Sequence, residues 1–206
     1  LYGNILINKI SKIDNNLWIG TRDGLFIYDQ TNDNFLNNFA VEALQGLNIS
    51  DFYFMENILI TISNIGISIL DTKNNKFYAG HKFGYKDKNF IYPIDFSSFT
   101  DIAYNNDKVY VLNREGIISF DLQERKWSNV LDATLYNGKS ANALAVKNNI
   151  FFISTLDGIY KYDKISNLSE FYSYDFIKNT NDVYIYDDFV FFGTRNGLIS
   201  FRYNKR

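Results

Sequence analysis

The 206-residue chain has no cysteine and only one histidine, one methionine and one proline. The absence of cysteine excludes disulfide scaffolds, zinc ribbons, iron–sulfur clusters and thiol nucleophiles. His81 has no second histidine with which to build a His-based metal site, and no acidic segment has the spacing of a calcium loop. The chain also has no run of 18 or more apolar residues, so no membrane insertion is expected. We therefore expect no metal and no cofactor.

The chain also has no large excess of charge of one sign, since it contains 21 basic and 23 acidic residues and its net charge is −2. Such a balance argues against a broad electrostatic surface for nucleic acid or for an anionic membrane. The side chains are 46% hydrophobic and 18% aromatic, which excludes a disordered chain. A domain of this size buries roughly 70% of the surface that its unfolded chain exposes, enough to fold without disulfides or metal.

The N-terminus lacks the basic, apolar and small-residue order of a signal peptide. Because the chain begins with Leu1 rather than Met, we expect a mature form or a fragment, which leaves open that an upstream signal was removed. The absence of cysteine fits an extracytoplasmic bacterial protein. A periplasmic or extracellular location is the expectation.

The sequence does contain a repeat, which occurs five times and is centred on a glycine. Residues 17–29 and 190–201 are its clearest copies, and 58–71, 109–121 and 150–163 are the others. The anchor glycines are Gly24, Gly66, Gly116, Gly158 and Gly197. Their spacings are 42, 50, 42 and 39 residues, close to the length of one four-stranded propeller blade.

Each repeat contains four strand-like runs, named a to d, and almost no helical periodicity. A polar or acidic residue precedes four of the anchor glycines, as in a tight b–c hairpin that needs a positive φ. A second turn of Asn, Asp or Glu lies eight to ten residues before each glycine, at 15–16, 56–57, 106–107, 148–149 and 187–188. The predicted a strands are 51–54, 100–104, 142–146 and 182–186, and the predicted d strands are 35–39, 76–79, 126–130 and 171–174. The one candidate helix is 41–47.

Residues 17–25 (LWIGTRDGL) and 192–198 (FGTRNGL) resemble the repeat of two-component regulator propellers. The resemblance implies a β-propeller of the kind found in extracytoplasmic sensor regions of bacterial hybrid histidine kinases and in related periplasmic or secreted proteins. Copies two and three lack the Trp and the Gly-Thr step. Kinship with pyrroloquinoline-type or NHL-type repeats therefore stays open.

The sequence thus predicts an all-β chain, a single β-propeller domain over 1–206 with about five four-stranded blades. The expected units are 8–39, 49–79, 99–130, 142–174 and 181–206. The fifth unit has no fourth run, which residues 1–7 would supply if the ring is closed. The alternative is that the five units are part of a larger ring.

In a propeller, the b–c turns and the d–a links share one face, where binding residues are expected. Three of the b–c turns carry an arginine: Arg22, Arg114 and Arg195. Guanidinium groups suit the planar oxygens of a carboxylate, sulfate or phosphate. The alternative is that these arginines are only solvated turn residues.

The d–a link of the second unit, residues 80–96, is longer than the others and accounts for the 50-residue spacing. A long loop on a rigid scaffold tends to carry function, and this one mixes aromatic and basic side chains that suit a protein, peptide or glycan contact. Its candidate binding residues are His81, Lys82, Tyr85, Lys86, Phe90 and Tyr92. The alternative is a loop that caps the channel or packs on the next blade.

Aspartates recur at one repeat position, directly after the third strand: Asp29, Asp71, Asp121 and Asp163. Recurrence inside the repeat favours a turn-capping role over paired-carboxylate catalysis. We find no acidic residue or histidine repeated on the inner a strands, as a propeller lyase or glycosidase would need, so no catalytic residue is predicted. The predicted function is a non-catalytic binding or sensing module for a protein or a small anionic or glycan ligand. A structural subunit that scaffolds an envelope complex is the alternative, and a lyase or glycosidase is third.

Overall fold

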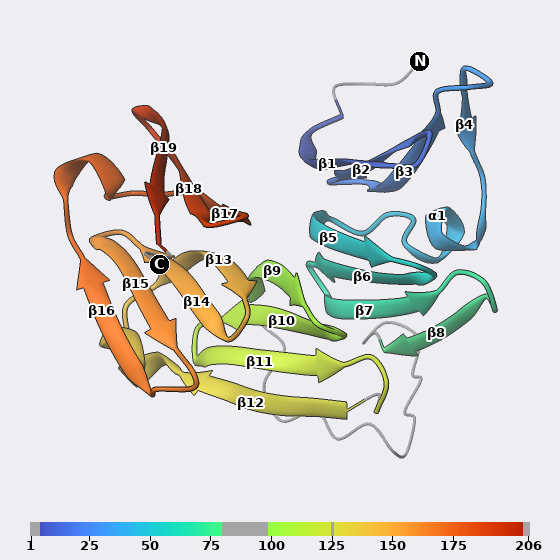
Figure 1. Ribbon diagram of the computed structural model, residues 1–206. Coiled ribbons are helices and arrows are strands. Elements are labelled where there is room, and N and C mark those ends of the chain that lie inside the picture. Colours follow the sequence, from blue (N-terminus) through green and yellow to red (C-terminus); the bar gives the residue numbers. More distant parts are fainter. Residues whose placement is uncertain (1–4, 80–98, 125, 204–206) are drawn as a thin grey trace. The chain divides into compact units, whose positions relative to one another are not determined.

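The computed structural model describes residues 5–79, 99–124 and 126–203. Over these residues the chain is all-β, and its five antiparallel sheets are the blades of a β-propeller (Figure 1). This confirms the fold predicted from the repeat. Among the described residues, helix is limited to α1 (Phe39–Ala43) and two short 3₁₀ turns, η2 (Ala133–Tyr136) and η3 (Asp175–Ile177).

The strands follow one another in chain order within each blade, so every blade is an up-and-down meander. Blade 1 consists of β1 (Ile7–Ile13), β2 (Asn16–Thr21), β3 (Gly24–Asp29) and β4 (Asn34–Leu36). Blade 2 consists of β5 (Ile49–Met55), β6 (Ile58–Ser63), β7 (Gly66–Asp71) and β8 (Lys76–Ala79). Blade 3 consists of β9 (Phe99–Asn105), β10 (Lys108–Asn113), β11 (Gly116–Asp121) and β12 (Lys126–Asp132).

Blade 4 consists of β13 (Ala141–Lys147), β14 (Ile150–Thr155), β15 (Gly158–Asp163) and β16 (Leu168–Tyr172). Blade 5 consists of β17 (Asp182–Tyr186), β18 (Phe189–Thr194) and β19 (Gly197–Arg202), with no fourth strand among the described residues. Blades 1 and 2 form one compact unit, and blades 3 to 5 form a second.

The five anchor glycines are confirmed at equivalent b–c turns. Each is the first residue of its blade's third strand and has a φ between 103° and 154°. The residue that ends the second strand fixes the same turn with its side chain. In blade 1 the Thr21 hydroxyl accepts a hydrogen bond from the amide of Asp23 (3.0 Å) and donates to the carbonyl of Gly24 (2.9 Å). The Thr of the Gly-Thr step is therefore part of the turn.

Some predicted boundaries shift by a few residues. The first a–b turn is Asp14-Asn15 rather than 15–16, because Asp14 takes the positive φ. The helix begins at Phe39, ahead of the predicted 41–47, since the Asn38 side chain caps it by accepting a hydrogen bond from the amide of Val41 (3.1 Å). β16 begins at Leu168 rather than 171, directly after a left-handed residue at Asn167.

The recurring aspartates cap the c–d turns, as predicted. The Asp29 carboxylate accepts hydrogen bonds from the backbone amides of Thr31 (2.8 Å) and Asn32 (3.2 Å), and from the Asn32 side chain (2.8 Å). These bonds, the Asn32 side chain first, hold the pKa of Asp29 below its usual value. The carboxylates at the same position in blades 2, 3 and 4 accept from the amides two and three residues later: Asp71, Asp121 and Asp163. They are turn residues, not a catalytic pair.

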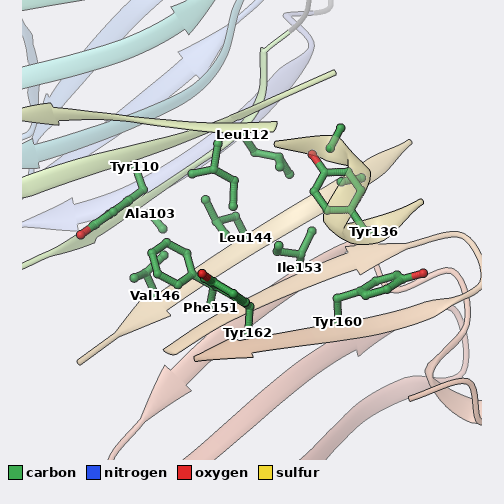
Figure 2. Close-up of a cluster of buried hydrophobic side chains, with 13 residues drawn as sticks. Ala103, Tyr110, Leu112, Tyr136, Leu144, Val146, Phe151, Ile153, Tyr160 and Tyr162 are labelled. Carbon is green, nitrogen blue, oxygen red and sulfur yellow. The ribbon is translucent and has the colours of Figure 1, made fainter. Parts of the chain in front are cut away.

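The blades pack face to face through apolar side chains. Figure 2 shows the core between blades 3 and 4, where Phe151 of β14 packs edge-on against Tyr110 of β10 with ring centroids 5.3 Å apart. Tyr136 of η2 is fully buried at the end of this core, and burial raises its pKa to about 12. A second core joins blades 4 and 5, and a third joins blade 1 to blade 2 and to the link that contains α1.

Residues 1–4 lie outside the described residues, so the predicted closure of blade 5 by residues 1–7 stays a prediction. Ile7, the last residue of that segment, is the first residue of β1 and pairs with Thr21 in blade 1.

Replacing Gly116 by alanine tests the b–c turn. A Cβ at Gly116 would lie 1.9 Å from the carbonyl oxygen of Leu131, at a φ of +145°. We expect Gly116→Ala to lower the free energy of unfolding by about 3 kcal/mol, combining backbone strain and overpacking. Gly197→Ala is the matched control, since φ is +120° there but nothing lies within 4 Å of the added Cβ. It should cost only about 1 kcal/mol from strain, as measured by urea unfolding. Equal losses of unfolding free energy in the two variants would contradict the claim that the fourth strand leaves no room for a side chain at Gly116.

Candidate binding face

The b–c turns and the d–a links lie on the same face within each compact unit, as predicted. The amide of Gly46, in the link after blade 1, donates to the carbonyl of Asp23 in the b–c turn (3.0 Å). Corresponding bonds join Ala133 to Glu115 in blade 3 (2.8 Å) and Asn179 to Leu156 in blade 4 (3.2 Å). Each of these three turns is thus tied to the link beside it. We call this face the turn face.

The three predicted arginines are exposed residues of b–c turns. Arg114 and Arg195 belong to the unit of blades 3 to 5, and Arg22 belongs to the unit of blades 1 and 2. Within the described ranges, no carboxylate forms an ion pair with any of the three guanidinium groups. Their donors are therefore available to an anion.

The predicted loop residues His81, Lys82, Tyr85, Lys86, Phe90 and Tyr92 lie outside the described residues. Their role in binding stays a prediction.

The two lysines of the links on the turn face of blades 3 to 5 are paired. Lys139, in the link after blade 3, lies 2.5 Å from the carboxylate of Asp157 in the b–c turn of blade 4. Lys178 pairs with Asp175 in the next link (2.7 Å). The hydrogen bond from Lys139 lowers the pKa of Asp157, and that bond raises the pKa of Lys139 in turn. These lysines are already neutralised, which leaves Arg114 and Arg195 as the unpaired cations of the three b–c turns in this unit.

The expectation that no acidic residue recurs on the inner strands was wrong. Asp51, Asp101 and Asp182 occupy one register position on the a strands of blades 2, 3 and 5, opposite Ile62, Leu112 and Gly193. Each lies 15 residues before its anchor glycine, a sequence signal that could have identified them.

Two of the three carboxylates at this position make structural contacts. Asp101 accepts hydrogen bonds from the amide of Ile102 (2.9 Å) and from the amide of Leu144 in blade 4 (2.6 Å), so it links two neighbouring inner strands. Asp51 accepts from the amide of Phe52 (2.8 Å) and pairs with Lys9 of blade 1 (3.0 Å). Backbone amides thus donate to both carboxylates.

Within the part of the chain that the structure describes, no group of three or more His, Asp or Glu side chains is arranged to hold a metal ion. Among the same residues, no helix combines the length and the apolar character of a membrane span.

No protein-family model and no curated protein matches the chain. Solved structures match it at low sequence identity. One is the extracellular domain of the putative one component system BT4673 from B. thetaiotaomicron, with a TM-score of 0.67 and 17% identity, covering 98% of this chain and 27% of that one. The others include the RRP9 WD40 repeats (TM-score 0.75, 8% identity, 100% and 62% covered) and BamB from Moraxella catarrhalis (0.62, 12%, 93% and 57%).

These likenesses support the propeller fold and no specific function. The chain spans about a quarter of the length of the BT4673 extracellular domain.

Substitution of Asp101 tests the link between blades 3 and 4. Asp101→Ala leaves the amide of Leu144 without its acceptor, and we expect a loss of about 2 kcal/mol in the free energy of unfolding. Asp182→Ala, at the same repeat position but exposed, is the control and should change stability by less than about 0.5 kcal/mol. Thermal unfolding followed by circular dichroism measures both. Equal effects would show that Asp101 does not join the blades.

Proposed function

We propose that the chain is a non-catalytic, extracytoplasmic propeller of the two-component regulator type that binds a protein or an anionic glycan through its turn face. The observation that carries the proposal is the set of exposed arginines on b–c turns, among which backbone hydrogen bonds tie the turns of Arg22 and Arg114 to neighbouring links. Arg114 and Arg195 have no acidic partner among the described residues, whereas the nearby lysines of the links are paired.

Two further observations support a binding role. The inner-strand carboxylates Asp51 and Asp101 are engaged by backbone amides, which argues against acid–base chemistry at the inner strands. The sequence motif at 17–25 and the likeness to the BT4673 extracellular domain favour a sensor of the same kind.

The test is binding of the 206-residue chain to acidic oligosaccharides, with chondroitin sulfate and polygalacturonate fragments as probes in calorimetry. Each single change, Arg22→Ala, Arg114→Ala or Arg195→Ala, should weaken binding roughly five- to tenfold, because a guanidinium fork contributes about 1 kcal/mol or more to an anion contact. Lys164→Ala is the control, since Lys164 is an exposed cation of a c–d turn, at the other end of its strand from the b–c turn.

Equal affinity of the arginine variants and the wild-type chain would contradict binding through the turn face. Cleavage of either oligosaccharide would contradict the non-catalytic role. Absence of binding to every probe would favour the alternative of a structural subunit.

A further inference from the structure

A cavity lies beside the third strand of blade 1, where the fourth strand ends early. β4 pairs only with Ile27, Tyr28 and Asp29, the second half of β3. The chain then leaves the sheet for α1 (Figure 1). In blade 3, by contrast, β12 pairs along the whole of β11, as far as Gly116. The first half of β3 is therefore flanked by the link of residues 37–46 instead of by a strand.

The cavity has a volume of about 540 Å³ and is lined by β3, the b–c turn and this link. Its lining residues all belong to blade 1 and the link that follows it, and the structure describes every one of them. Four of them carry side-chain oxygens, and two of the apolar ones are Leu25 and Val41: the four are Asp23, Asn37, Glu42 and Gln45. The cavity thus combines an apolar wall with a set of oxygen acceptors.

The ionisable side chains of this lining are both acidic. Asp23 and Glu42 are exposed, and none of the described residues that line the cavity is basic. Within the described ranges neither carboxylate forms an ion pair. The amide of Asn37 donates a hydrogen bond to Glu42 (3.1 Å), which orients that carboxylate without neutralising it. The cavity therefore carries two negative charges that lack a cationic partner in this part of the chain.

Backbone and cap interactions hold both sides of the cavity in place. The Asn38 side chain accepts a hydrogen bond from the amide of Val41 (3.1 Å), which fixes the first turn of α1 and with it Glu42. The amide of Gly46 donates to the carbonyl of Asp23 (3.0 Å), which ties the end of the link to the b–c turn. The two carboxylates therefore come from elements that are already anchored, and little order has to be gained on binding.

We propose that this cavity binds a primary ammonium group carried on a short apolar chain, as in an alkylamine or a lysine side chain. The carboxylates of Asp23 and Glu42 balance the charge. An ammonium group has three hydrogen-bond donors and no acceptor, which matches a lining with side-chain oxygens, those of Asn37 and Gln45 included. The methylene chain packs on apolar lining such as Val41. This cation site is separate from the anion binding proposed for the arginines.

The experiment titrates n-butylammonium and the peptide acetyl-Gly-Lys-Gly-amide into the 206-residue chain and follows backbone amide shifts by NMR. n-Butanol is the matched control ligand, because it has the same apolar chain without the charge. We expect saturable binding of both amines and affinity for butanol that is roughly tenfold lower or less. Tighter binding of the peptide would assign the site to a lysine of a partner polypeptide. Tighter binding of the free amine would assign it to a small amine, and both results support the proposal.

Two isosteric variants test the carboxylates. Asp23→Asn and Glu42→Gln remove one charge each from exposed positions, and each should weaken amine binding roughly three- to fivefold. Asp14→Asn makes the same charge change in the a–b turn of blade 1, at the other end of its strands, and should leave the affinity unchanged. Val41→Phe keeps both charges but fills the cavity, so amine binding should be lost.

Absence of saturable binding by both amines would overturn the proposal, and so would equal affinity for butylammonium and butanol. Unchanged affinity in the double variant of Asp23→Asn and Glu42→Gln would overturn it as well, whatever Val41→Phe does to the melting temperature. Arg22→Ala should not weaken amine binding, although the proposed turn-face function predicts that it weakens anion binding. The two proposals can therefore fail independently.

Discussion

The antiparallel pairing of the third strand, on one side with the second strand and, in blades 1 to 4, on the other with the fourth, is the constraint on which the blades depend. The pairing with the second strand is closed by an anchor glycine with a positive φ and fixed by the side chain of the residue that ends that second strand, such as Thr21 or Asn113. The pairing with the fourth strand brings a carbonyl so close to Gly116 that no side chain fits there. The aspartate after the third strand then turns the chain back through hydrogen bonds to its amides. Burial of the faces between blades follows from these pairings, because the period-2 alternation of strands sends successive side chains to opposite faces.

Much of this arrangement could be predicted from the sequence, because the same physical requirement recurs in every repeat. The glycines, the turn-capping aspartates and the strands near them fall at regular intervals, and Asp163 has the role that Asp29 indicates. Boundaries were less predictable where tertiary contacts decide them. The short strand β4 is an example. It ends at Leu36 because the chain then enters the helix capped by Asn38, whereas the sequence predicted a strand over 35–39.

The candidate sites were harder to predict. An arginine in a turn is visible in the sequence, but whether it is paired depends on links such as the one that places Lys139 on Asp157. The inner-strand aspartates were missed because the residue at their position varies among the blades. Blade 1 has Lys9 there, and blade 4 has Ala143. The lack of a fourth run in the fifth unit is visible in the sequence, whereas a cavity beside Phe201 depends on how side chains of blades 4 and 5 pack.

Amide hydrogen exchange at two equivalent serines tests the central claim most directly. Ser119 of β11 pairs with a fourth strand, whereas no strand pairs with Ser200 on the outer side of β19 among the described residues. Pairing makes exchange depend on opening of the blade, so the amide of Ser119 should be strongly protected and that of Ser200 should exchange at close to the unprotected rate in the chain alone. Equal protection of the two amides in the chain alone would contradict an open edge on blade 5.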